Sequence, residues 1–120
     1  MQLREQKNLA IMAEYSNTRP MKDDLGEIKA IYGKFLEVAN PMCRDNTKIF
    51  VLIIFFMYSP VSLVNKRICR GGVRREIGRV LGLSNSAVTK YFADAKSLLF
   101  NHKGFRNEAE GAYQRLCEVV

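Results

Sequence analysis

Residues 74–93 read RREIGRVLGLSNSAVTKYFA and decide the fold, because two short helical patterns meet within them. Before the meeting point, apolar residues recur at the i, i+4, i+7 and i+8 spacing of one helix face. These residues are Val73, Ile77, Val80 and Leu81. Gly82 follows them, and a glycine just past the last periodic residue can adopt the left-handed conformation that ends a helix. Ser84 is suited to cap the next helix, because its hydroxyl can accept a hydrogen bond from an unpaired backbone N–H.

A second helix is predicted directly after this turn. Its apolar stripe runs through Val88, Tyr91 or Phe92, Ala95, and Leu98 or Leu99. Four polar residues share the opposite side of the same helix, close to its start. They are Asn85, Ser86, Thr89 and Lys90. This polar face is the candidate recognition surface of the protein.

The spacing of Gly78, Gly82 and Val88 resembles the pattern of helix-turn-helix DNA-binding domains. In that pattern a small residue precedes the glycine of the turn by four positions, and a β-branched residue follows that glycine six positions later. The small residue lets the helices approach closely, and Val88 fills the angle between them. The small residue is usually alanine. Because glycine inside a helix costs about 1 kcal/mol relative to alanine, the first helix must be stabilised by tertiary packing.

The resemblance extends to the tetrahelical domains of response-regulator and sigma-factor type. More loosely, residues 48–115 are similar to small helix-turn-helix proteins of bacterial conjugative elements and phages. No activity is transferred from those relatives. The helix-turn-helix resemblance implies sequence-specific binding of double-stranded DNA, with the helix from Asn85 in the major groove, and we expect a transcriptional regulator of a mobile element or phage. It implies base contacts for the four polar residues of that helix, Asn85, Ser86, Thr89 and Lys90.

The positive charge of the chain is concentrated around this motif. Residues 1–46 hold seven Lys/Arg and seven Asp/Glu, whereas residues 47–120 hold twelve and five, so the net charge of +7 lies in the second part. Dense cationic side chains favour a phosphate backbone, because binding releases its counterions. The residues expected at phosphates are Lys66, Arg67, Arg70, Arg74, Arg75, Arg79 and Ser84. Taken alone, residues 66–79 are equally consistent with a solvated basic loop.

The rest of the chain predicts an all-α protein, because no alternating β pattern with turn partners occurs. Ten apolar residues from Ile49 to Tyr58 contain no charge. Since a membrane span needs about 20 residues, this run predicts a helix buried on all sides. Further helices are predicted over residues 3–16, 22–40 and 105–118, with a short helical turn after Ser59-Pro60.

The segment from Pro41 to Asn46 is the predicted boundary between two parts. Residues 1–46 would form an N-terminal helical pair, whose amphipathic second helix covers its apolar stripe with the C-terminal part or with a second copy. Residues 47–120 would form the helix-turn-helix domain. Within this domain, the segment from Asn65 to Gly72 is predicted as a basic loop that leads into the motif. In this loop Gly71-Gly72 either approaches a phosphate or serves as a flexible connector.

Catalytic and metal-binding groups are not predicted. His102 stands beside Lys103 in a predicted loop, where solvent exposure or a helix C-terminal cap explains it better than general-base catalysis. Cys43, Cys69 and Cys117 lack metal-ligand spacing and argue for a reducing compartment. The charged N-terminus does not resemble a secretory signal. We therefore expect a cytoplasmic protein with no cofactor, metal, membrane contact or evident small-molecule ligand.

Two functions from different classes remain open. The first is DNA binding as a homodimer, with the 22–40 or 105–118 helix forming the seam, because one small motif rarely binds tightly alone. The second is a non-catalytic protein-interaction module that keeps the helix-turn-helix shape without binding DNA. Salt-dependent binding to duplex DNA distinguishes the two, because an interaction module would lack it.

Overall fold

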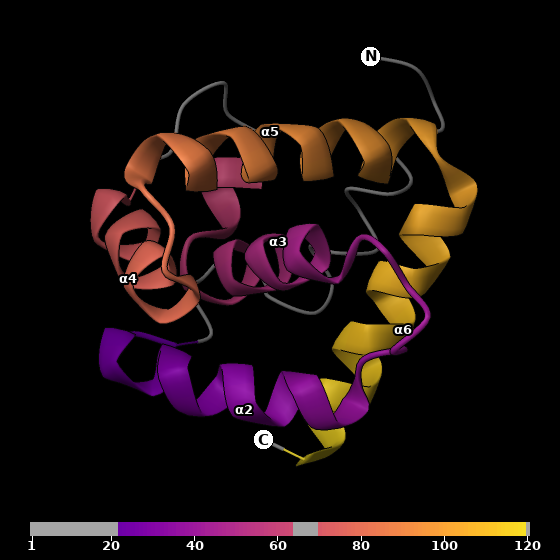
Figure 1. The fold of residues 1–120 in the computed structure, drawn as a ribbon, viewed down its shortest axis with the longest axis horizontal. Coiled ribbons are helices and arrows are strands. Elements are labelled where there is room, and N and C mark those ends of the chain that lie inside the picture. The colour runs from indigo at the N-terminus through magenta and orange to yellow at the C-terminus, as the bar shows by residue number, and fades with distance from the viewer. Residues whose placement is uncertain (1–21, 64–69, 120) are drawn as a thin grey trace.

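The computed structural model describes residues 22–63 and 70–119 and contains, within these ranges, helices and no strand (Figure 1). Five are α-helices: α2 (Ile28–Val38), α3 (Asn46–Tyr58), α4 (Gly71–Leu81), α5 (Asn85–Asn101) and α6 (Lys103–Val119). Two are short 3₁₀ helices, η1 (Leu25–Glu27) and η2 (Pro60–Leu63). The all-α prediction is confirmed, and the helix predicted over residues 3–16 lies outside the described ranges. None of the described helices is long and apolar enough to span a membrane.

Helix α3 forms the centre of the molecule. In Figure 1, α5, α4, α2 and α6 surround it as a frame, and α3 contacts all four. Every residue from Ile49 to Tyr58 is buried, as the uncharged run predicts. Aromatic rings fix the contacts on two sides: Phe55 stacks on Phe92 of α5, with ring centroids 4.0 Å apart, and Phe56 meets the edge of Tyr113 of α6 at 5.1 Å. Because residues 49–58 of α3 have no polar side, the frame must cover this part of the helix completely.

Helix α2 shares this core. Its side chains Ile28, Ile31 and Phe35 are buried in the same cluster as α3, and the rings of Phe35 and Phe50 lie 5.3 Å apart. The stripe of α2 therefore packs within its own chain, which is one of the two predicted arrangements. Residues 41–45 form turns between α2 and α3 and do not separate two cores. Within residues 22–46, the buried side chains of α2 therefore lie in one cluster with those of the helices that follow.

A cluster of polar contacts joins the start of α2 to the end of α3. Asp24 caps η1, its carboxylate accepting a 2.9 Å hydrogen bond from the Gly26 N–H. The Tyr58 hydroxyl donates a 2.9 Å hydrogen bond to the Asp24 carbonyl oxygen. Burial of this hydroxyl, together with the negative charges of Glu27 and Asp24, raises the pKa of Tyr58 to about 12, although Arg70 acts in the opposite direction.

The break between α5 and α6 is shorter than the sequence predicts. Only His102 separates Asn101, the last residue of α5, from Lys103, the first of α6. The His102 ring nitrogen Nδ1 accepts a 2.9 Å hydrogen bond from the Phe105 N–H, so the imidazole caps α6. This contact explains how the chain turns between two long helices within one residue, and it assigns His102 a capping role.

Candidate nucleic-acid interface

The turn between α4 and α5 has the two caps that the sequence predicts. Gly82 has a φ of 72°, in the left-handed region, and its N–H donates to the Gly78 carbonyl. The Leu83 N–H donates a 2.8 Å hydrogen bond to the same oxygen. On the far side, the Ser84 hydroxyl accepts a 3.1 Å hydrogen bond from the Ala87 N–H. The connection is therefore a fixed three-residue turn.

A close contact at Gly78 sets how α4 meets this turn. A Cβ atom at position 78 would lie 2.5 Å from the Leu83 carbonyl oxygen and 3.5 Å from Cγ2 of Val88. Alanine, the usual residue of the resembled pattern, does not fit here. Val88 is fully buried, and the α5 stripe continues through buried Phe92, Ala95 and Leu99. Of the alternative stripe positions, Phe92 rather than Tyr91 and Leu99 rather than Leu98 are therefore fully buried in the core.

The opposite side of α5 is open to solvent. All four predicted recognition residues, Asn85, Ser86, Thr89 and Lys90, are exposed. Within the described part of the chain, the side chains of Asn85, Ser86 and Lys90 make no hydrogen bond or ion pair. Thr89 differs, because its hydroxyl donates to the Asn85 carbonyl at 2.9 Å and accepts from Nη1 of Arg74 at 3.3 Å. The face thus carries three polar side chains available to a ligand and one held by its neighbours.

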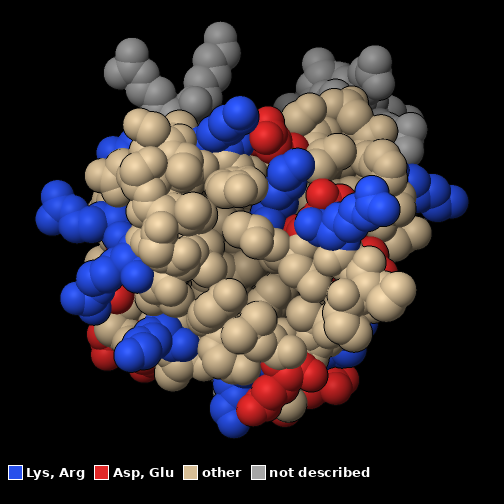
Figure 2. Space-filling model, viewed as in Figure 1, with Lys and Arg blue, Asp and Glu red and all other residues tan. Residues whose placement is uncertain are grey.

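Cationic side chains of α4 border this face. Figure 2 shows Lys and Arg gathered at the edge of the molecule over α4. Arg75 is exposed and has no hydrogen bond or ion pair to any described residue. The Arg79 side chain is 77% exposed and pairs with Glu76 at 2.9 Å. Arg74 is half-buried, and its Nε is buried without a hydrogen-bond partner among the residues that the structure describes.

Arg70 does not belong with these cations. Its guanidinium donates hydrogen bonds to the Tyr58 carbonyl at 2.9 Å and to the Asp23 carbonyl at 3.2 Å. This arrangement ties the residue before α4 to the end of α3 and to Asp23, two residues before η1, so the Arg70 guanidinium is engaged by backbone carbonyls. Gly71 and Gly72 are the first residues of α4, so the loop predicted to extend to Gly72 is shorter. Lys66 and Arg67 lie outside the described residues.

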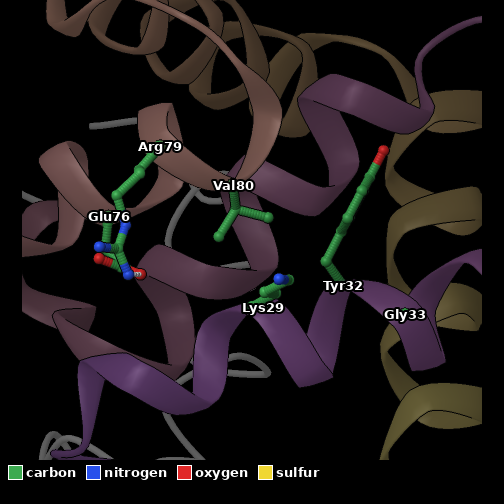
Figure 3. Close-up of a pocket in the computed structure, with 6 residues that line it drawn as sticks. All are labelled: Lys29, Tyr32, Gly33, Glu76, Arg79 and Val80. Carbon is green, nitrogen blue, oxygen red and sulfur yellow. Dashed lines mark hydrogen bonds and ion pairs between the residues drawn. The ribbon is translucent and has the colours of Figure 1, made fainter.

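The structure also contains a groove between α2 and α4 that the sequence did not predict (Figure 3). It has a volume of about 780 Å³. Lys29, Tyr32 and Gly33 line it from α2, and Glu76, Arg79 and Val80 line it from α4. Of the proposed DNA-contacting residues only Arg79 lines this groove, so the groove is separate from the exposed face of α5.

No group of side chains in residues 22–63 and 70–119 is arranged to hold a metal ion.

Comparison of the chain with protein-family models, with curated proteins and with solved structures found no match in any of the three. The contact that the sequence did not reveal is the Arg74–Thr89 hydrogen bond. Its partners are 15 residues apart on two helices, and no local pattern signals such a contact.

Proposed function

We propose that the chain binds double-stranded DNA sequence-specifically, with α4 and α5 as a helix-turn-helix and α5 in the major groove. The observation that carries this proposal is the unpartnered polar face at the start of α5 beside the exposed cations of α4. The first turns of a recognition helix point into the groove, where the side chains that hydrogen-bond base edges must be polar and accessible. Asn85, Ser86 and Lys90 meet both conditions.

The proposed contacts fall into two groups. Asn85 and Lys90 suit base edges, because an amide can bond adenine N6 and N7, and an ammonium can donate to guanine O6 and N7. Arg75 and Arg79 suit phosphates, which fix the position of the protein without reading sequence. Arg79 can exchange Glu76 for a phosphate at low cost, because its own side chain is 77% exposed and a pair three residues apart on one helix contributes less than about 1 kcal/mol. Arg74, Ser84, Lys66 and Arg67 complete the proposed phosphate set.

We further propose that the protein acts as a homodimeric transcriptional regulator in the cytoplasm. A single helix-turn-helix covers a short site, and two-fold pairing places recognition helices on half-sites about 34–36 Å apart. Leu36 of α2 is 58% exposed, which supports α2 as the seam. Sedimentation of the parent and of Leu36→Glu tests the seam. The parent should be a dimer and the variant a monomer, and an unchanged dimer would exclude this position from the interface.

The experiment for DNA recognition is selection of duplexes from a random pool, followed by affinity measurements on the selected site and on random DNA. Asn85→Ala and Lys90→Ala should each weaken binding to the selected site by about 1–3 kcal/mol and change random binding less. Arg75→Ala should weaken both alike. Asn107→Ala, an exposed change on α6, is the matched control and should alter neither. Failure to enrich any duplex at low salt would favour the protein-interaction alternative.

A further inference from the structure

Thr89 is the one recognition residue whose polar group is already engaged. Its hydroxyl proton is donated to the Asn85 carbonyl oxygen at 2.9 Å, and one of its lone pairs accepts from Nη1 of Arg74 at 3.3 Å. A threonine hydroxyl has one proton and two lone pairs. The hydroxyl therefore has no proton to offer to a base, and the acceptor atoms of the major groove, which are N7, O6 and O4, cannot be bonded by it.

The same two hydrogen bonds fix the direction of the side chain. In a helix, threonine divides between two χ1 rotamers because its hydroxyl can bond a carbonyl one turn earlier. The bond to Asn85 selects one rotamer, and the bond from Arg74 on the neighbouring helix holds it. Arg74 is thus a positioning residue. The residue is exposed, so its γ-methyl and one remaining lone pair of the hydroxyl are left to contact a ligand, and the methyl is the larger of the two surfaces.

We propose that Thr89 reads thymine through its methyl group, and that each half-site contains a thymine whose C5-methyl packs against this side chain. This inference rests on the proposed DNA binding. In the major groove the thymine methyl is the one apolar feature of a base edge, and threonine methyls are among the groups that contact it. Asn85 and Lys90, one turn before and one residue after, provide the hydrogen bonds that Thr89 cannot.

The test replaces thymines of the selected site by deoxyuridine, one at a time. Uracil pairs with adenine as thymine does and lacks only the methyl group, so the base-pairing pattern is unchanged. For the full-length parent, replacing the contacted thymine of a single half-site should weaken binding about fourfold, the loss expected when one buried methyl group is removed. Fluorescence anisotropy at fixed salt measures the ratio of the two affinities.

Two variants assign the effect to the residue. Thr89→Ser keeps the hydroxyl and removes the methyl, so it should bind the thymine and uracil sites equally. Thr89→Val keeps a methyl and removes the hydroxyl, so it should retain the roughly fourfold preference. Thr47→Ser, an exposed change on α3, is the matched control and should behave as the parent. Thermal melts confirm that all variants are folded.

The outcomes separate this inference from the proposed function. Sequence-specific binding in which no thymine position responds to uracil would overturn the methyl contact and leave DNA recognition standing. A thymine preference that survives Thr89→Ser, or disappears in Thr89→Val, would assign the contact to another side chain or to the hydroxyl. Absence of duplex binding by the parent would overturn both proposals.

Discussion

A Cβ atom built on Gly78 would lie 2.5 Å from the carbonyl oxygen of Leu83, so α4 meets the turn with no space for a side chain. Gly78→Ala should therefore destabilise the protein. Overpacking costs about 1–3 kcal/mol, which exceeds or offsets the gain of about 1 kcal/mol from helix propensity. The expected net result is a lower melting temperature in a thermal unfolding experiment monitored by circular dichroism.

Gly33→Ala on α2 is the matched control for this prediction. A Cβ at Gly33 would have no atom within 4 Å, and the residue lies inside an α-helix. Only the propensity gain applies there, so the substitution should stabilise the protein by about 0.5–1 kcal/mol. If Gly78→Ala stabilised the protein as much as Gly33→Ala, the close contact at the turn would be wrong.

Adjacent positions on α5 should respond in opposite ways to the same charge. Val88 is fully buried, so Val88→Asp places an unpaired carboxylate in an apolar site at a cost of several kcal/mol, a large part of the 5–15 kcal/mol that stabilises a small domain. Thr89 is exposed beside Arg74, so Thr89→Asp should leave melting nearly unchanged and abolish duplex binding by repelling phosphate. The reverse pattern would mean that the faces of α5 are assigned wrongly.

Two arginines near α4 should separate stability from binding. Arg70→Ala removes two hydrogen bonds to backbone carbonyls and should lower the free energy of unfolding by about 1–3 kcal/mol while the salt dependence of DNA binding stays the same. Arg75→Ala should change stability by less than about 0.5 kcal/mol and reduce the salt slope by about 0.9. Urea unfolding and anisotropy titrations measure the two quantities. Identical behaviour of both variants would contradict the distinction.

Stability should fall at high pH because of Tyr58. In the unfolded chain a tyrosine loses its proton near pH 10, whereas the folded protein keeps the Tyr58 proton until about pH 12. Between these values the unfolded state binds fewer protons, so the free energy of unfolding decreases as pH rises, and below pH 10 the contribution is fully present. Tyr58→Phe should flatten this decrease in urea unfolding from pH 9 to 12. Parallel pH profiles for parent and variant would exclude Tyr58 as the cause.

The sequence predicts the elements whose causes are local. Gly82 and Ser84 act on neighbours within one helical turn, and the uncharged run of α3 requires burial whatever surrounds it. These predictions are confirmed by the left-handed φ of Gly82, the cap at Ala87 and the complete burial of Ile49 to Tyr58.

Contacts between distant segments could not be predicted in the same way. Arg70 reaches Asp23 across 47 residues of sequence, and its charge alone places it with the other basic residues. The apolar stripe of α2 predicts a covering surface without saying which one, and the structure provides α3 and α6. Gly78 carries a propensity cost in the sequence, and only the position of the Leu83 carbonyl explains why the glycine stands there.

The salt dependence of duplex binding tests the central claim most directly. The full-length chain is titrated with fluorescent duplex DNA at several salt concentrations, and the logarithm of the association constant is plotted against the logarithm of salt. Each phosphate neutralised contributes about −0.9 to the slope. Engagement of phosphates by the three cations Arg74, Arg75 and Arg79 predicts a slope of about −2.7, and further cations steepen it. A slope near zero, or no binding at low salt, would contradict the account.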